Sequence, residues 1–225
     1  MDALKVIARL RCDFPTKFGL PRQSGLNDAL KGKLVFEPAY RNPDAVRGIE
    51  AYSHLWLIWG FSVPEKENWS ATVRPPRLGG NERVGVFASR SPFRPNGLGL
   101  SAVELEHVSL DEADSPVLYV RGADMVSGTP IFDIKPYLAY ADSYPDAAGG
   151  FTGGDAGEML AVDFPPELLA QFDSGERHGL LSALGADPRP RYQEDSERVY
   201  GMRYAGKNVR FTVGDGVVHV VEVET

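Results

Sequence analysis

The segment from Arg74 to Ser101 restricts the fold of this chain more than any other stretch. Its sequence, RPPRLGGNERVGVFASRSPFRPNGLGLS, contains five arginines, no lysine, four prolines and five glycines. Proline fixes φ and glycine permits conformations that a Cβ forbids, so the backbone is held in a few unusual geometries. Arginine presents planar donors that match carboxylate or phosphate groups and that stack on aromatic rings. The composition leaves two interpretations open, a surface Ω-loop with solvated arginines and an anion-binding site.

Length and cysteine content indicate an ordinary globular protein. A chain of 225 residues with 43% hydrophobic content can bury a full core, as one domain or as one domain with a smaller appendage. The single cysteine, Cys12, cannot form an internal disulfide, and the four histidines lack metal-ligand spacing, so we expect no metal site. No apolar run approaches the roughly 20 residues of a membrane span, and the N-terminus lacks the apolar region of a secretory signal. We therefore expect no membrane contact and a cytoplasmic location.

The charge is unevenly distributed along the chain. The net charge is −7, but residues 1–110 carry 15 Lys and Arg against 11 Asp and Glu, whereas residues 111–225 carry 9 against 20. This distribution argues against a broad basic surface and permits a local basic face. Such a face binds a polyanion through a few contacts with a modest salt dependence.

Period-two alternation and β-branched residues predict a chain that is mainly β over its first two-thirds. In SHLWLIWGF both faces are apolar, as in a central strand that is covered on both sides. We expect strands at 4–11, 33–37, 54–61, 83–88, 98–108, 117–121 and 158–163.

The last third of the chain predicts a small α+β unit. Apolar residues from Pro166 to Leu184 fall on one face behind an N-terminal proline, which is typical of a single packed helix. Strands are expected at 199–204, 208–213 and 217–224. The glycine-rich stretch from Asp142 to Gly157 indicates a mobile loop or linker. We therefore divide the chain into a β domain over 1–145, a linker with a return strand over 146–163, and the α+β unit over 164–225.

Three further segments combine turn residues with polar side chains. LPRQSGL, from Leu20, places backbone amides and two polar side chains in a turn, where they can converge on a ligand. GADMVSGTPIFDIKPY, from Gly122, follows a strand, and within it Asp133 and Lys135 are better explained as a structural ion pair than as a site. DPRPRY, from Asp187, suits a phosphate or carboxylate, with Tyr192 as a stacking face. GxGxxG, P-loop and GxSxG motifs are absent from the sequence, so any nucleotide is held in another way.

Together these segments resemble the TsaA-like or TrmO family of methyltransferases. That family uses S-adenosyl-L-methionine to methylate N6 of threonylcarbamoyladenosine at position 37 of tRNA. The resemblance spans nearly the whole chain and rests on six segments in the family's order. They are PRQSGL, VRGIEAYSHLWLIW, VRPPRLGGNERVGVFASRSPFRPN, GLGLSAVELE, DMVSGTPIFDIKPYLAYADS and DPRPRY.

The resemblance implies a single-sheet β-barrel and a homodimer with the cofactor pocket near the subunit interface. By motif position, it also implies that two short segments and several single residues contact S-adenosyl-L-methionine. Two residues depart from the family pattern, since Ser127 replaces an acidic residue and Ser62 replaces a histidine. The implied cofactor contacts are Pro21, Arg22, Gln23, Phe61, Ser62, Arg90, Leu100, Asp124, Met125, Val126 and Ser127.

Methyl transfer from a sulfonium needs alignment and exclusion of water more than it needs a metal. The proton on N6 calls for an acceptor, and Asp124, Asp187 and the carbonyls of the proline turns all stay open as candidates. The anionic anticodon loop of tRNA calls for fixed cations and a stacking ring. The residues that we predict to bind this substrate are Arg74, Arg77, Arg94, Arg189, Arg191 and Tyr192.

Two other interpretations remain compatible with the residues. The chain could be a non-catalytic module that binds S-adenosyl-L-methionine or RNA, since Ser62 and Ser127 replace family residues. It could also be a related methyltransferase that acts on another substrate.

Overall fold

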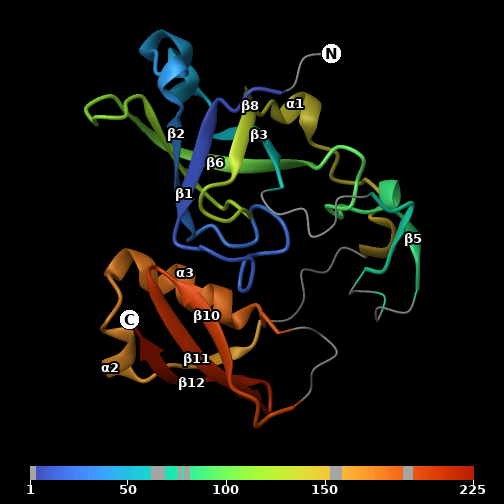
Figure 1. Cartoon of the computed structure of the whole chain (residues 1–225), viewed down its shortest axis with the longest axis vertical. Helices are drawn as coiled ribbons and strands as arrows, with labels where there is room; N and C mark the ends of the chain where they lie inside the picture. The colour runs from blue at the N-terminus through green and yellow to red at the C-terminus, as the bar shows by residue number, and fades with distance from the viewer. Residues whose placement is uncertain (1–3, 62–68, 76–77, 79–81, 153–158, 190–194) are drawn as a thin grey trace.

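A closed barrel of six antiparallel strands forms the first part of the molecule (Figure 1). The computed structural model describes residues 4–61, 69–75, 78, 82–152, 159–189 and 195–225. Around the barrel the strand order is β1-β2-β7-β6-β3-β8, and pairing between β8 and β1 closes it. This confirms the predicted mainly β fold with a single-sheet barrel. The strands are β1 (Ala8–Cys12), β2 (Lys31–Phe36), β3 (His54–Gly60), β6 (Leu98–Ser109), β7 (Val117–Arg121) and β8 (Pro130–Pro136).

Period-two alternation fills the barrel. On β3, Leu55, Leu57 and Trp59 point into the core, while Trp56 is only half-buried on the other face. The strand is therefore covered on both sides, but unequally. We did not predict β8 as a strand, because its two terminal prolines and the preceding glycine indicate a turn.

Short helical turns connect the barrel strands. Three of them, η1 (Pro38–Tyr40), η2 (Pro43–Val46) and η3 (Ile49–Ala51), lead from β2 to β3, and α1 (Ala139–Asp142) and η6 (Gly150–Thr152) follow β8. The start of the predicted mobile loop was wrong. The carboxylate of Asp142 accepts hydrogen bonds from Trp56 Nε1 at 2.9 Å and from the backbone N–H of Leu138 at 2.8 Å, so this residue anchors α1 to the barrel.

The described residues between 69 and 97 form an arm that projects from the barrel (Figure 1). It contains a two-stranded sheet of β4 (Thr72–Val73) and β5 (Val84–Gly85), followed by the turn η5 (Val86–Ala88). The predicted strand over 83–88 is therefore wrong after Gly85. Val86 is buried and donates its backbone N–H to Ala71, and the chain turns there, which leaves Phe87 72% exposed.

The C-terminal unit is a four-stranded sheet with two helices. The strand order is β10-β11-β12-β9, and only the β12–β9 pair is parallel. By this pairing β9, which we placed with the linker, belongs to the C-terminal sheet. The elements are β9 (Ala161–Asp163), α2 (Pro166–Leu169), α3 (Ser174–Gly185), β10 (Tyr200–Tyr204), β11 (Lys207–Gly214) and β12 (Val217–Glu224).

The single helix predicted over 166–184 is two helices, so that prediction is wrong. Asp173 interrupts the pattern as the N-cap of α3, and its backbone N–H donates to Glu176 Oε2 at 2.9 Å. This is a capping box, which satisfies the free amides at the start of a helix. The D-x-x-E spacing from Asp173 to Glu176 could have revealed the second start.

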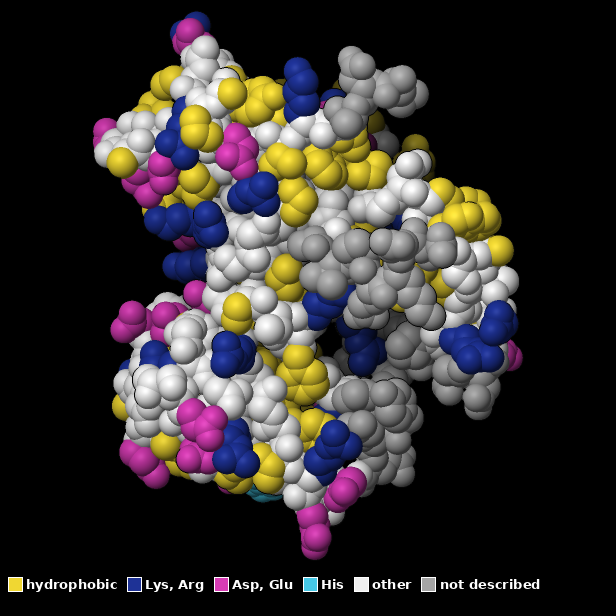
Figure 2. Space-filling view, viewed as in Figure 1, with side chains coloured by type: hydrophobic (Ala, Val, Ile, Leu, Met, Phe, Trp, Pro, Cys, Tyr) yellow, Lys and Arg dark blue, Asp and Glu magenta, His cyan; other side chains and the backbone are white. Residues whose placement is uncertain are grey.

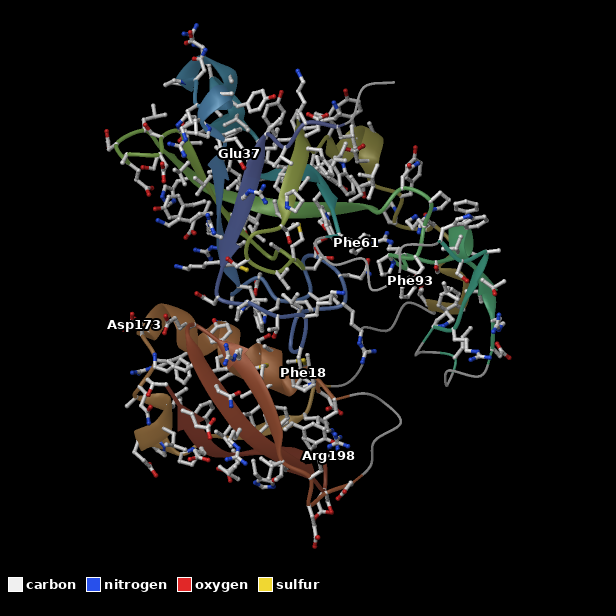
Figure 3. All side chains as sticks on the ribbon, in the orientation of Figure 1. Phe18, Glu37, Phe61, Phe93, Asp173 and Arg198 are labelled. Carbon is white, nitrogen blue, oxygen red and sulfur yellow. The ribbon has the colours of Figure 1, made fainter. Side chains whose placement is uncertain are left out.

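The loop between β1 and β2 joins the two parts of the molecule. The Phe14 ring packs edge-on against Tyr204 of β10, with ring centroids 5.1 Å apart. Buried Asn27 donates its side-chain amide to the carbonyl of Gly179 on α3 at 3.2 Å. Phe18 lies between the barrel and the C-terminal sheet in Figure 3. The C-terminal core therefore holds the loop that carries the PRQ segment, and both ends of this loop continue into barrel strands.

Candidate functional site

The PRQ loop (residues 21–23) and the DMVS turn (residues 124–127) meet at one end of the barrel. Gly122 follows β7 with φ of 73°, a backbone conformation that favours glycine. Its carbonyl accepts the backbone N–H of Gly25 at 2.9 Å, and a Cβ at Gly122 would press against the Gly25 backbone at 3.3 Å. This close approach brings Gln23 and Asp124 to the same end of the barrel, although they lie far apart in sequence.

The carboxylate of Asp124 lies at the end of a buried chain of hydrogen bonds. Ser101 on β6 donates its hydroxyl to Asp124 Oδ1 at 2.6 Å. Trp59 on β3 donates its indole Nε1–H to Ser101 Oγ at 2.9 Å. Ser101 is 1% exposed, so this polar chain is shielded from water. We call Trp59, Ser101 and Asp124 the Asp124 network.

Burial raises the pKa of Asp124 above the ordinary aspartate value. The hydrogen bond from Ser101, the backbone amides of Asp124 and Ser24, and the positive charge of Arg90 oppose this rise without cancelling it. The carboxylate is therefore only partly compensated. A group of this kind, held in a loop-lined end of a barrel, can receive a cation or a hydroxyl donor from a ligand.

The arm contacts the PRQ loop through Arg90. Arg90 donates Nη1–H to Gln23 Oε1, and Gln23 in turn donates its amide to the carbonyl of Arg22 at 2.5 Å. Pro21 is half-buried and Arg22 is exposed. The structure thus brings together the predicted contacts from the PRQ loop and the arm.

Phe61 extends the site along β3. Its ring packs edge-on against Trp59 with centroids 4.5 Å apart, and its backbone N–H donates to Gly97 at 3.0 Å. Figure 3 shows Phe61 at the end of β3, on the side where Phe93 of the arm lies. Ser62 lies outside the described residues.

The side chain of Leu100 points away from the Asp124 network. It alternates with buried Ser101 on β6, so it lies on the outer face of the barrel, where it is 55% exposed. The predicted role as an apolar wall would need a ligand on that outer face.

Most side chains and backbone groups of the DMVS turn make contacts within the protein. The side chain of Met125 is buried in the barrel core, and the carbonyl of Val126 accepts from the Thr129 hydroxyl at 2.8 Å. Ser127 Oγ accepts the backbone N–H of Cys12 at 3.3 Å, and its own backbone N–H donates to Phe14 at 2.8 Å. Where the family has an acid, this chain has a hydroxyl that ties the turn to β1.

The second predicted aspartate is already paired. Asp187 follows α3 in the C-terminal unit, and Arg189 donates Nε and Nη2 to its two carboxylate oxygens at 2.8 and 2.9 Å. This bidentate geometry is the strongest form of the Arg–carboxylate pair. The sequence predicted Asp187 as a proton acceptor and Arg189 as a substrate contact, whereas in the structure they bind each other.

The other predicted substrate residues divide into three groups. Arg94 donates Nη1–H to the carbonyl of Ser89 at 2.8 Å and lies over the Phe87 ring, so it organises the arm. Arg74 is exposed next to β4. The remaining three lie outside the described residues: Arg77, Arg191 and Tyr192.

The ion pair predicted between Asp133 and Lys135 is confirmed, with Lys135 Nζ 2.9 Å from Asp133 Oδ2. Trp59 and Ser101 were missed, because both read as ordinary strand residues. A possible signal was Gly99, which lies two residues before Ser101 on the same face of β6.

Among the described residues, no group of His, Cys, Asp or Glu side chains is arranged to hold a metal ion. No helix in the described part of the chain is long and apolar enough to cross a membrane.

Two family models match the chain over most of its length. The model described as the tRNA-methyltransferase O N-terminal domain matches residues 9–143, and the model described as the TrmO C-terminal domain matches residues 157–225.

Individual relatives agree with these matches. The tRNA (adenine(37)-N6)-methyltransferase of Escherichia coli (strain K12) is 41% identical over 97% of this chain and 96% of its own length. A Methanothermobacter thermautotrophicus protein named "Probable S-adenosyl-L-methionine-binding protein" is 32% identical over 62% of this chain and 93% of its own. A crystal structure of TrmO from Pseudomonas aeruginosa superposes with a TM-score of 0.80 at 28% identity, covering 100% of this chain and 99% of that one.

Proposed function

This chain belongs to the tRNA-methyltransferase O family, and we propose that it transfers a methyl group from S-adenosyl-L-methionine to N6 of threonylcarbamoyladenosine at position 37 of tRNA. The observation that carries the proposal is the convergence of three distant segments on one carboxylate. The PRQ loop, β6 and the DMVS turn all contribute to the surroundings of Asp124. The name of the Escherichia coli relative supports the methylated position on tRNA.

The residues present fit S-adenosyl-L-methionine. The cofactor carries an ammonium group, ribose hydroxyls and an adenine ring, and the site offers a partly compensated carboxylate at Asp124 and polar side chains at Gln23 and Arg90. Phe61 supplies an aromatic wall beside them. We assign Asp124 to the ammonium group or a ribose hydroxyl, and the PRQ loop to the remaining polar edges.

When bound, the cofactor supplies a methyl group that its sulfonium already makes electrophilic. The chain then has to fix the target nitrogen in line and exclude water. Asp124 orients the cofactor, because its carboxylate is itself held by the hydrogen bond from Ser101. Asp187 takes no part in proton transfer in this proposal, since Arg189 already occupies both of its oxygens.

tRNA approaches from the side of the arm in this proposal. Figure 2 shows Lys and Arg side chains at the edge of the hollow between the barrel, the arm and the C-terminal unit. Arg74 is exposed on the arm, and so is the Phe87 ring, over which Arg94 lies. These groups suit phosphates and unstacked bases of a single-stranded loop. Because the net charge is −7, we expect few phosphate contacts and a shallow salt dependence of binding.

The homodimer and the cytoplasmic location belong to the same proposal. A dimer is supported by large aromatic side chains that the fold leaves exposed and that the tRNA assignment does not use: Trp69, Tyr140 and Tyr144. Light scattering coupled to size-exclusion chromatography tests it, and a monomer at micromolar concentration would contradict it.

Nucleoside mass analysis tests the activity. Purified protein and S-adenosyl-L-methionine are incubated with tRNA that carries threonylcarbamoyladenosine, and with the same tRNA lacking that modification as a control. We expect one added methyl group on the modified nucleoside and none on the control. Cofactor binding without methyl transfer would instead support a binding module, and a methyl group on another nucleoside would support a different substrate.

A further inference from the structure

Three observations set Ser101 apart from the other serines of the barrel. It is one of the few polar residues that are fully buried, it donates to Asp124 at 2.6 Å, and it accepts from Trp59 at 2.9 Å. The 2.6 Å distance lies in the range of charge-assisted O–H···O⁻ bonds. A buried hydroxyl in this position is satisfied on both sides.

The chemistry of the three groups fixes the direction of the chain. An indole N–H only donates, so Trp59 must use Ser101 Oγ as an acceptor. The single hydroxyl hydrogen of Ser101 is then left for Asp124. Hydrogen bonds in such a series polarise one another, which strengthens the bond that reaches the carboxylate.

Gly99 makes the arrangement possible. Gly99 lies opposite Trp59 in the β3–β6 pairing, and a Cβ at this position would overlap indole carbons of Trp59. Without that Cβ, the indole lies across β6 and reaches Ser101 two residues further along. The same ring packs against Phe61 at 4.5 Å. The buried Trp59 indole therefore contacts Phe61, which we assign to the cofactor, and also donates to Ser101, which holds Asp124.

We propose that Ser101, oriented by Trp59, is a positioning residue that holds Asp124 as a fixed hydrogen-bond acceptor toward the cofactor. The inference rests on the proposed function, in which Asp124 receives the ammonium group or a ribose hydroxyl of S-adenosyl-L-methionine. It adds that the barrel core, and not only the loops, determines cofactor affinity.

The first test follows the Asp124 carboxyl carbon by ¹³C NMR in the cofactor-free protein, with Asp124→Asn used for assignment. In Ser101→Ala the pKa of Asp124 should rise further, because a hydrogen bond that lowers it is lost. Trp59→Phe should raise it less, since the hydroxyl remains. An unchanged Asp124 pKa in Ser101→Ala would overturn the inference.

The second test measures S-adenosyl-L-methionine affinity by calorimetry across pH. We expect Ser101→Ala to bind about tenfold more weakly at neutral pH, the size of a hydrogen bond to a charged group. The rise of affinity with pH that accompanies ionisation of Asp124 should lie at higher pH in Ser101→Ala than in wild type. In an Asp124→Asn background the same substitution should have no further effect. A pH-independent loss that adds to that of Asp124→Asn would mean a merely structural role and would overturn the inference.

Tyr204→Phe is the matched control. It also removes a buried hydroxyl, which donates to the Glu176 carbonyl at 3.0 Å, but in the C-terminal core. It should lower thermal stability without moving the Asp124 pKa, and a shift there as large as that in Ser101→Ala would overturn the inference. Failure of the proposed function is recognised separately: wild-type protein that binds no S-adenosyl-L-methionine refutes it before any substitution is made, and the positioning role falls with it.

Discussion

Asp124 at the end of the barrel and Asp187 after α3 are the two aspartates that the sequence nominates for chemistry, and their surroundings balance the carboxylate charge differently. Arg189 meets Asp187 with two parallel hydrogen bonds. Asp124 accepts one hydroxyl hydrogen bond and backbone amides, and the cation that acts on it, Arg90, donates its own Nη1–H to Gln23. A neutralised carboxylate has little to offer a ligand, whereas an under-compensated one gains by binding a cation.

The largest predicted difference between the two regions is in turnover. Asp124→Asn removes the charge while keeping the shape, and we expect methylation to fall about a hundredfold. Asp187→Asn should change it by less than about threefold, because the pair that it breaks is partly exposed. Initial rates on tRNA carrying threonylcarbamoyladenosine measure both. Equal losses would remove the distinction between the two aspartates.

Gly99→Ala is expected to damage the barrel end through packing. Its new Cβ overlaps the rigid indole of Trp59, and overpacking of this kind costs about 1–3 kcal/mol of the free energy of unfolding. Gly85→Ala is the matched control, since no atom lies within 4 Å of the added Cβ. Urea denaturation compares the two variants. A neutral Gly99→Ala would show that the indole can move without cost, and that its position is not fixed.

Arg189→Ala tests the ion pair with Asp187 in the C-terminal unit. It frees the Asp187 carboxylate and removes a cation that we predict to bind tRNA. Methylation at limiting tRNA should fall about fivefold, as expected for one lost phosphate contact, while S-adenosyl-L-methionine affinity stays unchanged. Steady-state kinetics and calorimetry separate these quantities. Equal loss in both would move Arg189 into the cofactor site.

The smallest predicted effect is on stability as a function of pH. Burial raises the pKa of Asp124 in the folded protein, so the folded state binds this proton more tightly than the unfolded chain does. Ionisation therefore costs stability as pH rises from the unfolded value of about 3.9 through the folded one. Asp124→Asn should be more stable than wild type at neutral pH, and the difference should disappear well below the unfolded pKa of about 3.9. Greater stability of wild type at neutral pH would contradict the assigned environment.

The sequence predicted most barrel strands because period-two alternation is strong wherever one face is buried. It failed where local signals conflicted with tertiary contacts. β8 carries a proline at each end of PIFDIKP, and it is a strand because β1 and β3 pair with it on either side. The arm strand ends early because Val86 turns inward instead of continuing.

The candidate site was predictable by segment but not by side-chain partner. Turn residues identified the PRQ and DMVS segments, and the resemblance assigned their role. Periodicity treats Trp59 as an apolar core residue, so it cannot reveal the indole N–H bond across β6 to Ser101. Similarly, Asp187 and Arg189 lie two residues apart, and composition does not show that they bind each other.

The most direct test of the central claim is to titrate Asp124 by ¹³C NMR with and without saturating S-adenosyl-L-methionine. If the carboxylate of Asp124 receives the ammonium group or a ribose hydroxyl, the bound cofactor should lower the pKa of Asp124, and the affinity should rise with pH through that titration. A titration of Asp124 that the cofactor leaves unchanged would contradict the account.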